Sequence, residues 1–415
     1  MSESTTTAAT ATSYLKARKG ALVGAVFLMA TSAIGPGFIT QTATYTVALG
    51  AAFAFGILIS ILIDIVVQLN VWRMLTQAGK YAFQLANEAI PFSGHVIATL
   101  VVFGGLVFNV GNIAGAGLGL NAALGLDPKI GGAISAVLAV GIFLYKRAGL
   151  AMDRLVIVLG LVMLALTAYV AVVSGPPVGD ALRQTVLPEE IDVAAITTIV
   201  GGTVGGYITY SGAHRLVDNG TVGPQNAAQV RRAAITGITL TGIMRYVLFL
   251  AILGVVATGV AIDTESTTAN PAAQAFGEAA GGVGLRVFGV IMWAAGITSV
   301  IGAAYTSVSF FASYNMRALE PRIRSRSTLG FIAVSLVVFL LLGAAPAALL
   351  VFAGGFNGLI LPIGLTVLMY VGFFRRDLLG GSYSWVLLIL GTLVTALSWY
   401  MGVTSVEPIF DLVLG

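Results

Sequence analysis

Cysteine is absent from the 415 residues, and only two histidines, His95 and His214, are present. The first absence excludes disulfide bonds, thiolate metal sites and cysteine nucleophiles, and the second excludes a histidine-rich metal site. Charged residues are also scarce, at 9% of the chain, whereas soluble domains have about 25%. Because 58% of the residues are hydrophobic, this composition predicts a polytopic membrane protein.

Catalytic motifs are missing as well. The sequence has no phosphate-binding loop, no cluster of metal ligands and no Ser/His/Asp arrangement outside its apolar runs. It therefore predicts a protein that is not an enzyme and has no ATPase of its own. The net charge of +4 does not point to nucleic acid as a partner, because the basic residues follow a membrane topology.

Long apolar runs, each of roughly twenty residues, dominate the chain from residue 21 onwards. The first run is too long for a signal-peptide core and lacks a small-residue cleavage pattern, so it is expected to remain as a span. With short polar loops between the runs, the sequence predicts an all-α membrane protein with about 11 transmembrane helices. The expected spans lie near residues 21–48, 51–72, 96–121, 130–146, 155–174, 194–214, 233–261, 284–311, 327–344, 346–373 and 382–404.

The loops differ in charge in a regular alternation. If the N-terminus is cytoplasmic, most of the 21 lysines and arginines fall in cytoplasmic segments, and the acidic residues collect in the outer loops. Such an excess of basic residues on the inner side commonly sets membrane topology. We therefore expect a multi-pass protein of the plasma (inner) membrane with its N-terminus cytoplasmic and its C-terminus outside. The long outer loops, 175–193 and 262–283, are expected to cap a vestibule.

The first span has a helix-breaking sequence in its middle, Gly35-Pro36-Gly37. Pro36 lacks a backbone donor and clashes with the preceding turn, and the glycines allow the backbone to leave helical geometry. An unpaired backbone group costs several kcal/mol in lipid, so broken helices persist only where they line a cavity inside the protein. The break therefore predicts a binding site.

The sixth span contains five glycines between residues 201 and 212, and each costs a helix about 1 kcal/mol relative to alanine. Its segment 206–209 also resembles segment 37–40 of the first span. Breaks in spans one and six indicate two inverted five-span repeats around a midplane site; the alternative is two flexible helices without a site. The expected regions are a cytoplasmic tail (1–20), a first repeat (21–175), a second repeat (194–373) and a final span with the C-terminal tail (382–415).

Residues 35–38, 67–80, 146–154 and 296–299 form a series of short segments whose order and spacing are informative. Together they resemble parts of the first, second, fourth-to-fifth and eighth spans of the Nramp (natural resistance-associated macrophage protein) family of divalent metal-ion transporters. The resemblance extends over nearly the whole chain. It implies the LeuT-type fold, a 5+5 inverted repeat with broken helices 1 and 6, and a small-molecule or ion substrate.

The same resemblance locates departures from the family pattern. In the family, an Asp and an Asn of the first span bind the metal, and here Gly35 and Phe38 stand at those positions. The methionine and histidine of the family's sixth span correspond to Thr209 and Ser211, and acidic residues of its third span correspond to asparagines. Transition metals prefer carboxylate, imidazole or sulfur ligands, and Mg²⁺ usually needs one or two carboxylates. The chain is therefore expected to be a divergent member that lacks the metal-binding residues.

Free backbone amides and neutral polar side chains remain at the two breaks. Amides at the start of a half-helix favour an anionic group, and a LeuT-type transporter holds an amino-acid carboxylate in this way. We expect a secondary transporter that moves a small organic carboxylate or amino acid by alternating access; a divalent metal cation (Mn, Fe or Mg) transporter and a non-transporting membrane receptor are the alternatives. The expected substrate-binding residues are Gly35, Pro36, Gly37, Phe38, Thr40, Gln41, Asn109, Asn112, Gly206, Tyr207, Thr209, Tyr210 and Ser211.

A further group of residues is expected to act in coupling or gating, because ionisable groups within spans are costly and are functional candidates by default. Asp64 and Arg245 are either a structural ion pair, or a coupling-proton site and a contact for the substrate anion. His214 is either an inner-face anchor or a proton relay. Thr298 and Ser299 are candidate ligands for Na⁺. We expect no cofactor other than Na⁺ or H⁺ as the coupling ion, and a monomer in the lipid bilayer.

Overall fold

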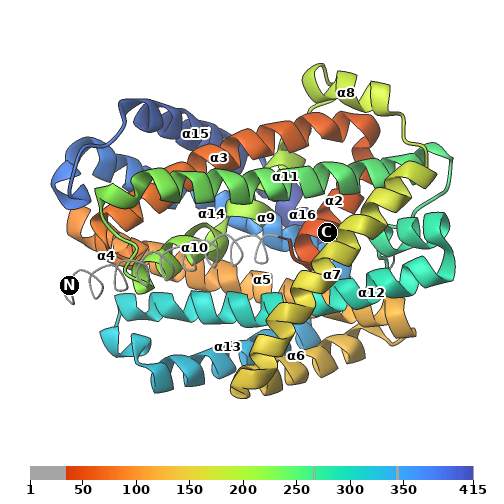
Figure 1. The fold of residues 1–415 in the computed structure, drawn as a ribbon, viewed down its shortest axis with the longest axis horizontal. Helices are drawn as coiled ribbons and strands as arrows, with labels where there is room; N and C mark the ends of the chain where they lie inside the picture. The colour runs from red at the N-terminus through yellow and green to blue at the C-terminus, as the bar shows by residue number, and fades with distance from the viewer. Residues whose placement is uncertain (1–33, 265, 267, 343–344, 415) are drawn as a thin grey trace, which may run out of the picture.

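The computed structural model describes residues 34–264, 266, 268–342 and 345–414, and within these ranges it contains helices and no strands (Figure 1). Side chains of residues 146–157 and 414 are outside this description. The α-helices are α2 (Pro36–Leu49), α3 (Phe53–Ala78), α4 (Ala82–Ala89), α5 (Ser93–Leu124), α6 (Pro128–Leu144), α7 (Lys146–Val173), α8 (Val178–Val186), α9 (Val193–Val204), α10 (Gly206–Asp218), α11 (Ala227–Ala257), α12 (Pro271–Ser307), α13 (Pro321–Leu341), α14 (Pro346–Phe374), α15 (Trp385–Thr404) and α16 (Val406–Leu414). Short 3-10 helices are η1 (Gly50–Ala52), η2 (Pro224–Asn226), η3 (Val308–Ser313), η4 (Met316–Leu319) and η5 (Arg376–Leu379).

The expected spans coincide with these helices, so the all-α membrane fold is confirmed. The first half of span one, before residue 34, lies outside the described residues. Judged by length and hydropathy, 8 helical stretches in the described ranges are able to cross a membrane, or up to 9 with the bent pair Val158–Val173 and Val178–Val186. Even the larger number is lower than 11, because α2 and α3 count as one stretch and because α6 is only 17 residues long.

Two segments expected as outer loops are partly helical. Residues 175–193 include α8, whose inner face buries Ala181 and Gln184. α12 begins at Pro271 rather than near residue 284, because the Asn270 side chain accepts a hydrogen bond from Ala273 N and proline suits a first helical turn. α12 is then interrupted at Gly281, which has a positive φ of 65°.

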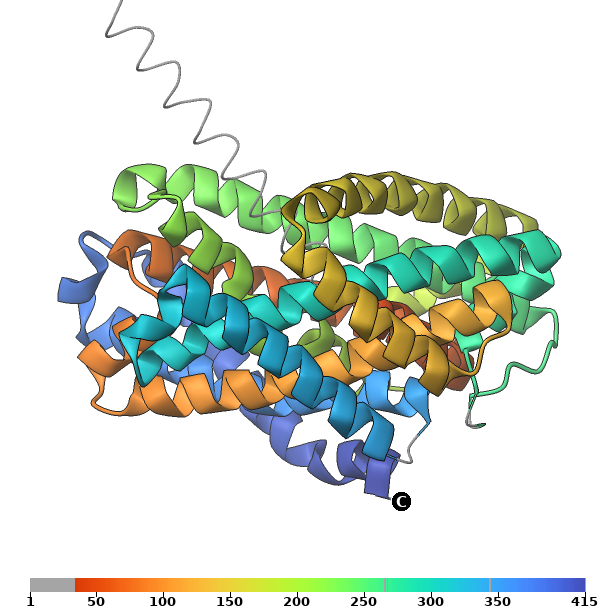
Figure 2. The same cartoon turned by 90° about the horizontal axis from the view of Figure 1, so that it is seen from below.

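Two pairs of long helices form the centre of the molecule. α3 lies beside α11, and α5 lies beside α12, all running along the long axis in Figure 1. α7 crosses α11 and α12 obliquely, and the turned view shows α7 and α11 on the face opposite α15 and α16 (Figure 2). Small residues permit the closest approach: a Cβ on Gly119 of α5 would lie 2.4 Å from the backbone nitrogen of Trp293 in α12. This packing positions α2, α9 and α10 inside the bundle.

Candidate functional site

α2 begins in the interior of the protein. Gly35 is extended, with φ −101° and ψ −175°, and Pro36 starts the helix, where its missing N–H costs no hydrogen bond. Residues 35–40 are all buried. α5 reaches this turn closely, because a Cβ on Gly115 would lie only 2.2 Å from Pro36 Cβ. The first backbone amides of α2 are therefore presented within the bundle rather than at a membrane surface.

The second break separates α9 from α10. Gly205 is extended, and Gly206 has a φ of +52°, a left-handed conformation that strongly favours glycine. The amide of Asn357, from α14, fills the space beside this turn: its Oδ1 would lie 2.0 Å from a Cβ on Gly206. Asn357 Nδ2 donates to the carbonyl oxygens of Gly104 (3.1 Å) and Ala353 (2.8 Å).

Sequence reasoning missed Asn357. The available signal was a single amide in a glycine-rich part of an otherwise apolar span, Gly354-Gly355-Phe356-Asn357-Gly358. That pattern resembles the polar, glycine-rich surroundings of the two breaks. Its position against the α9–α10 break was not readable from sequence, because the two segments are far apart in the chain.

Three helices meet at Gly35. A Cβ at this position would lie 2.9 Å from Ser299 Oγ of α12 and 3.8 Å from Asn112 Oδ1 of α5. Tyr207, the second residue of α10, has its phenol beside the Asn112 amide. Ser299 Oγ and Asn112 Nδ2 are buried without a hydrogen-bond partner. Gly35, Asn112, Tyr207 and Ser299, predicted as site residues from four separate spans, are thus brought together as one group, called here the central group.

Three other predicted residues have their hydroxyl or amide groups engaged elsewhere. Asn109 Nδ2 donates to Ser335 Oγ of α13 at 3.0 Å. Thr298 Oγ1 donates to the carbonyls of Ala294 and Ala295 within its own helix, and Ser211 Oγ donates to the Ile208 carbonyl in the same way. Such bonds to the preceding turn occupy the hydroxyl proton.

Gln41 joins α2 to α14. Its Nε2 donates to the Leu350 carbonyl of α14 at 3.0 Å, and its Oε1 is buried without a partner. Gly202 of α9 and Gly354 of α14 make room for this amide, since a Cβ on either would come within 2.3 Å of it. The Thr40 hydroxyl is likewise buried without a partner. Both side chains lie beside the breaks but outside the contacts that define the central group.

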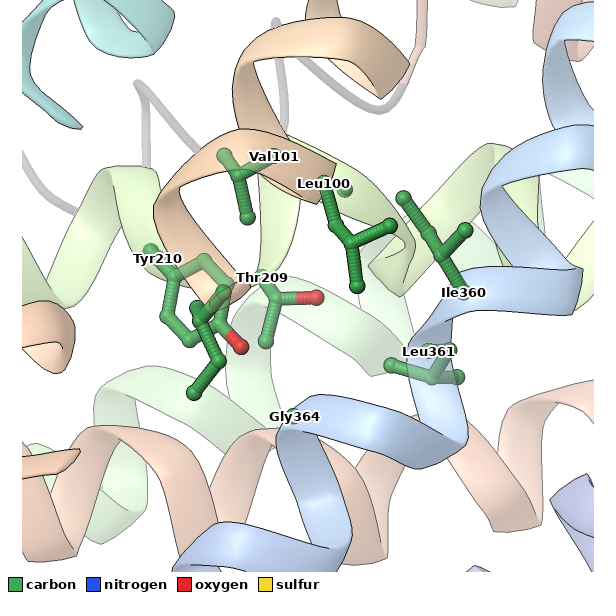
Figure 3. Close-up of a pocket in the computed structure, with 9 residues that line it drawn as sticks. Leu100, Val101, Thr209, Tyr210, Ile360, Leu361 and Gly364 are labelled. Atoms are coloured by element: carbon green, nitrogen blue, oxygen red, sulfur yellow. The ribbon is translucent and has the colours of Figure 1, made fainter. Parts of the chain in front are cut away.

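A cavity of about 20 Å³ adjoins the second break, which is room for about one water molecule. Gly206, Thr209 and Tyr210 of α10 line it together with apolar residues of α5 and α14. Figure 3 shows the Thr209 side chain pointing into the space between Leu100 and Leu361. The hydroxyl of Thr209 has no hydrogen-bond partner. The cavity is too small for an organic substrate in this conformation.

Arg245 of α11 lies over the ring of Phe38, with its guanidinium carbon 4.3 Å from the ring centroid. Its Nη1 donates to the Ile199 carbonyl of α9 at 3.2 Å. Asp64 of α3 is the charged neighbour of Arg245 and lies beside the Thr203 hydroxyl of α9. Both charged side chains are only 2% exposed. The two charged side chains therefore lie between the first turn of α2 and the last turn of α9, and among the described residues no ion pair joins them.

His214 lies at the far end of α10. Its Nε2 accepts a hydrogen bond from the first backbone N–H of α4, at Ala82, and its ring packs against Tyr81, Tyr210 and Phe310. The Tyr81 hydroxyl is hydrogen-bonded to Asp218. Burial raises the pKa of Tyr81 above its ordinary value, and the hydrogen bond to Asp218 raises it further. Because Nε2 accepts the hydrogen bond from Ala82 N–H, it carries no proton itself. The imidazole is therefore neutral here and caps the start of α4.

Histidine, aspartate and glutamate do not gather at either break. Within the ranges that the structure describes, no three of these side chains lie close enough together to hold a metal ion. The polar atoms available at the central group are hydroxyl, phenol and amide groups together with backbone amides. Such a donor set suits an anionic or neutral polar ligand.

Comparison with known proteins gives relatives over most of the chain. The family model for natural resistance-associated macrophage protein-like proteins (Nramp) matches residues 26–406. The "uncharacterized membrane protein YcsG" of Bacillus subtilis (strain 168) is 53% identical over 362 residues, covering 86% of this chain and 87% of that protein.

Two solved structures are also similar. One is the manganese transporter of Eremococcus coleocola (TM-score 0.74, 15% identity, 94% of this chain and 87% of that chain). The other is MhsT in complex with L-phenylalanine (TM-score 0.63, 16% identity, 94% of this chain and 98% of that chain). At these identities the two structures establish the fold, which is of the LeuT type.

Proposed function

Because the chain belongs to the Nramp family, and is by family and fold a secondary membrane transporter rather than an enzyme, we propose that its cargo is a small organic carboxylate or amino acid. Transport by alternating access would move this cargo across the plasma membrane, with the N-terminus cytoplasmic, the C-terminus outside and the protein as a monomer. The coupling ion is Na⁺ or H⁺.

The central group is the observation that carries this proposal. By the resemblance to the family, a metal-ligating carboxylate is expected where Gly35 stands, and here Ser299 Oγ occupies the space that a side chain would enter. Asn112 Nδ2 and Ser299 Oγ are buried donors without partners, and the first amides of α2 follow Gly35 directly in the chain. Three kinds of neutral donor around one point favour a carboxylate group.

A divalent metal ion is the second candidate. It is favoured by the family and by the similar structure of a manganese transporter. Against it stands the chemistry of the donors, since a dehydrated transition metal prefers carboxylate, imidazole or sulfur ligands. The likeness to a structure that holds L-phenylalanine is compatible with an organic cargo, but the shared fold does not decide between the two.

Uptake into proteoliposomes separates these candidates. We expect the purified protein to take up at least one of radiolabelled pyruvate, L-lactate, L-alanine and L-proline, and to take up neither Mn²⁺ nor Mg²⁺ above empty vesicles. Replacing Asn112 by Leu removes a donor at similar side-chain volume and should reduce the organic uptake about tenfold or more. Mn²⁺ uptake without organic uptake would overturn the carboxylate proposal, and no flux of any probe would favour a receptor.

His214 offers a separate test of the relay hypothesis. Since its Nε2 accepts a hydrogen bond from Ala82, glutamine should supply a comparable acceptor, and His214→Gln is expected to keep both stability and the pH profile of uptake. His214→Leu leaves the Ala82 N–H unpaired, at a cost of about 1–3 kcal/mol, and should melt at a lower temperature. A displaced pH profile in His214→Gln would instead indicate a proton relay.

A further inference from the structure

A guanidinium and a carboxyl group lie buried between the two breaks without a full set of partners. Arg245 and Asp64 come from α11 and α3, which lie side by side (Figure 1). Nε and Nη2 of Arg245 and Oδ1 of Asp64 have no hydrogen-bond partner. Among the ion pairs of the described residues, none joins these two side chains. Unpaired charges are expensive inside a membrane protein, so this conformation leaves Arg245 available to an anion.

The position of Arg245 relates it to both half-helices. Its guanidinium stacks on Phe38, which belongs to the first turn of α2 and follows Gly35 by three residues in the chain. Its Nη1 bond to Ile199 ties it to the last turns of α9, before the second break. With one face on an aromatic ring and two nitrogens unpaired, the guanidinium presents the planar fork that binds a carboxylate through two hydrogen bonds.

The surroundings of Asp64 make its carboxyl group a candidate for binding a proton. Thr203 donates to the Ile199 carbonyl at 2.8 Å, and a hydroxyl has only one proton to give. The Thr203 hydroxyl therefore has no second proton to give to Asp64, and Oδ1 of Asp64 is left without a partner, so binding a proton is the simplest way for this buried carboxyl group to lose its charge. Arg245 of α11 is the charged side chain that interacts with Asp64, and α9 places the Thr203 hydroxyl beside it. The described parts of the other helices that pack on α3 bring no further charged side chain into interaction with Asp64.

We propose that Arg245 binds the carboxylate of the substrate while Asp64 carries the coupling proton, so that one monoanionic carboxylate crosses the membrane with one H⁺. This inference rests on the proposed function and narrows it. When the substrate anion arrives, it takes the place of the Asp64 carboxylate beside Arg245, and Asp64 accepts one proton. On the other side, Asp64 gives up that proton, becomes the counter-ion of Arg245 again, and the substrate anion leaves.

Charge balance identifies the substrate class. The exchange keeps one negative charge beside Arg245 throughout, and the translocated pair carries no net charge. A zwitterionic amino acid would add an ammonium group to a site where Asp64, once protonated, no longer compensates it. Monocarboxylates such as pyruvate and lactate satisfy the balance, whereas neutral amino acids do not.

The test measures uptake of radiolabelled pyruvate and L-lactate in proteoliposomes that contain the pH dye pyranine. Wild-type protein should acidify the lumen by one proton for each carboxylate taken up. Asp64→Asn should still equilibrate the carboxylate, but with a proton-to-substrate ratio near zero; this ratio does not depend on how much protein is active. Arg245→Lys should raise the KM about tenfold or more, because an ammonium cannot form the two-pronged contact. Arg324→Lys is the matched control, since Arg324 also stacks on an aromatic ring, Tyr305, at 3.7 Å.

Each result decides the proposal. An unchanged proton ratio in Asp64→Asn, or a KM within twofold of wild type in Arg245→Lys, overturns it while leaving carboxylate transport in place. So does sodium-dependent uptake without acidification, or uptake of L-alanine and L-proline alone. If wild type takes up Mn²⁺ and no carboxylate, the proposed function itself fails. Should Asp64→Asn not yield monodisperse protein, Asp64→Asn with Arg245→Gln removes both charges together; proton-coupled pyruvate uptake by that double variant would equally overturn the inference.

Discussion

Replacing Gly206 by alanine is expected to reduce substrate uptake by about tenfold or more. Gly206 has a φ of +52°, where an L-residue costs roughly 1–2 kcal/mol, and its new Cβ would lie 2.0 Å from Asn357 Oδ1. Overpacking of this kind typically costs a further 1–3 kcal/mol, and about 1.4 kcal/mol corresponds to a factor of ten. This strain applies only to conformations that keep the left-handed turn at Gly206. The variant should therefore populate other conformations, in which the turn between α9 and α10 no longer has the shape that the site requires.

Gly220→Ala is the matched control for this prediction. Gly220 follows the other end of α10 and also has a positive φ (+70°), but a Cβ there would meet no atom within 4 Å. It therefore carries the backbone strain without the steric contact or proximity to the site. We expect it to melt at a slightly lower temperature and to transport at the wild-type rate. Uptake should be measured at equal amounts of reconstituted protein. Equal losses of uptake in both variants would mean that the Gly206 turn has no special role in transport.

Replacing Gly289 by alanine should have the largest effect on stability. A Cβ there would lie 2.5 Å from Ala123 N and 2.7 Å from the Gly119 carbonyl oxygen, both backbone atoms of α5. Neither atom can move without shifting the helix, so α5 and α12 must separate and lose their close packing. The expected cost is about 1–3 kcal/mol, seen as a melting temperature several degrees lower in detergent, with reduced yield of monodisperse protein.

Gly302→Ala on the same helix is the control. No atom would lie within 4 Å of its Cβ, so the substitution adds a better helix former at no steric cost. We expect its melting temperature to equal or exceed that of wild type, because alanine is favoured over glycine by about 1 kcal/mol in a helix interior. A similar loss in both variants would contradict the prediction, because it would show that the close contact between α5 and α12 at Gly289 is not what lowers the stability.

Donor chemistry, rather than fold, is the basis of the proposal that this chain carries an organic anion instead of a metal ion. The LeuT-type architecture is shared by a manganese transporter and by a structure that contains L-phenylalanine, so it leaves the cargo open. At the first break, glycine stands where the family resemblance leads one to expect a carboxylate, and Ser299 and Asn112 surround it. The proposed Arg245 contact would add the one buried cation that a carboxylate needs.

Much of the fold was determined by the sequence alone. Apolar runs of membrane length predict helices because lipid offers no partner for unpaired backbone groups, and that rule acts on each segment by itself. α2 begins at Pro36 after the extended Gly35, and α9 ends and α10 begins at Gly205-Gly206, as expected, since the reasons are local: a missing donor and a permitted positive φ. Errors arose where helix starts depended on caps, as at Pro271, and where an outer loop contained the amphipathic α8.

Tertiary structure alone decided which polar side chains meet. Ser299 reaches the first break whereas the adjacent Thr298 bonds its own helix, and Asn112 lies at Gly35 whereas Asn109, one turn earlier, binds Ser335. These choices follow from the rotation of α5 and α12 about their axes, which is set by glycine contacts between helices far apart in the chain. Sequence thus specified that two breaks exist; packing specified their neighbours.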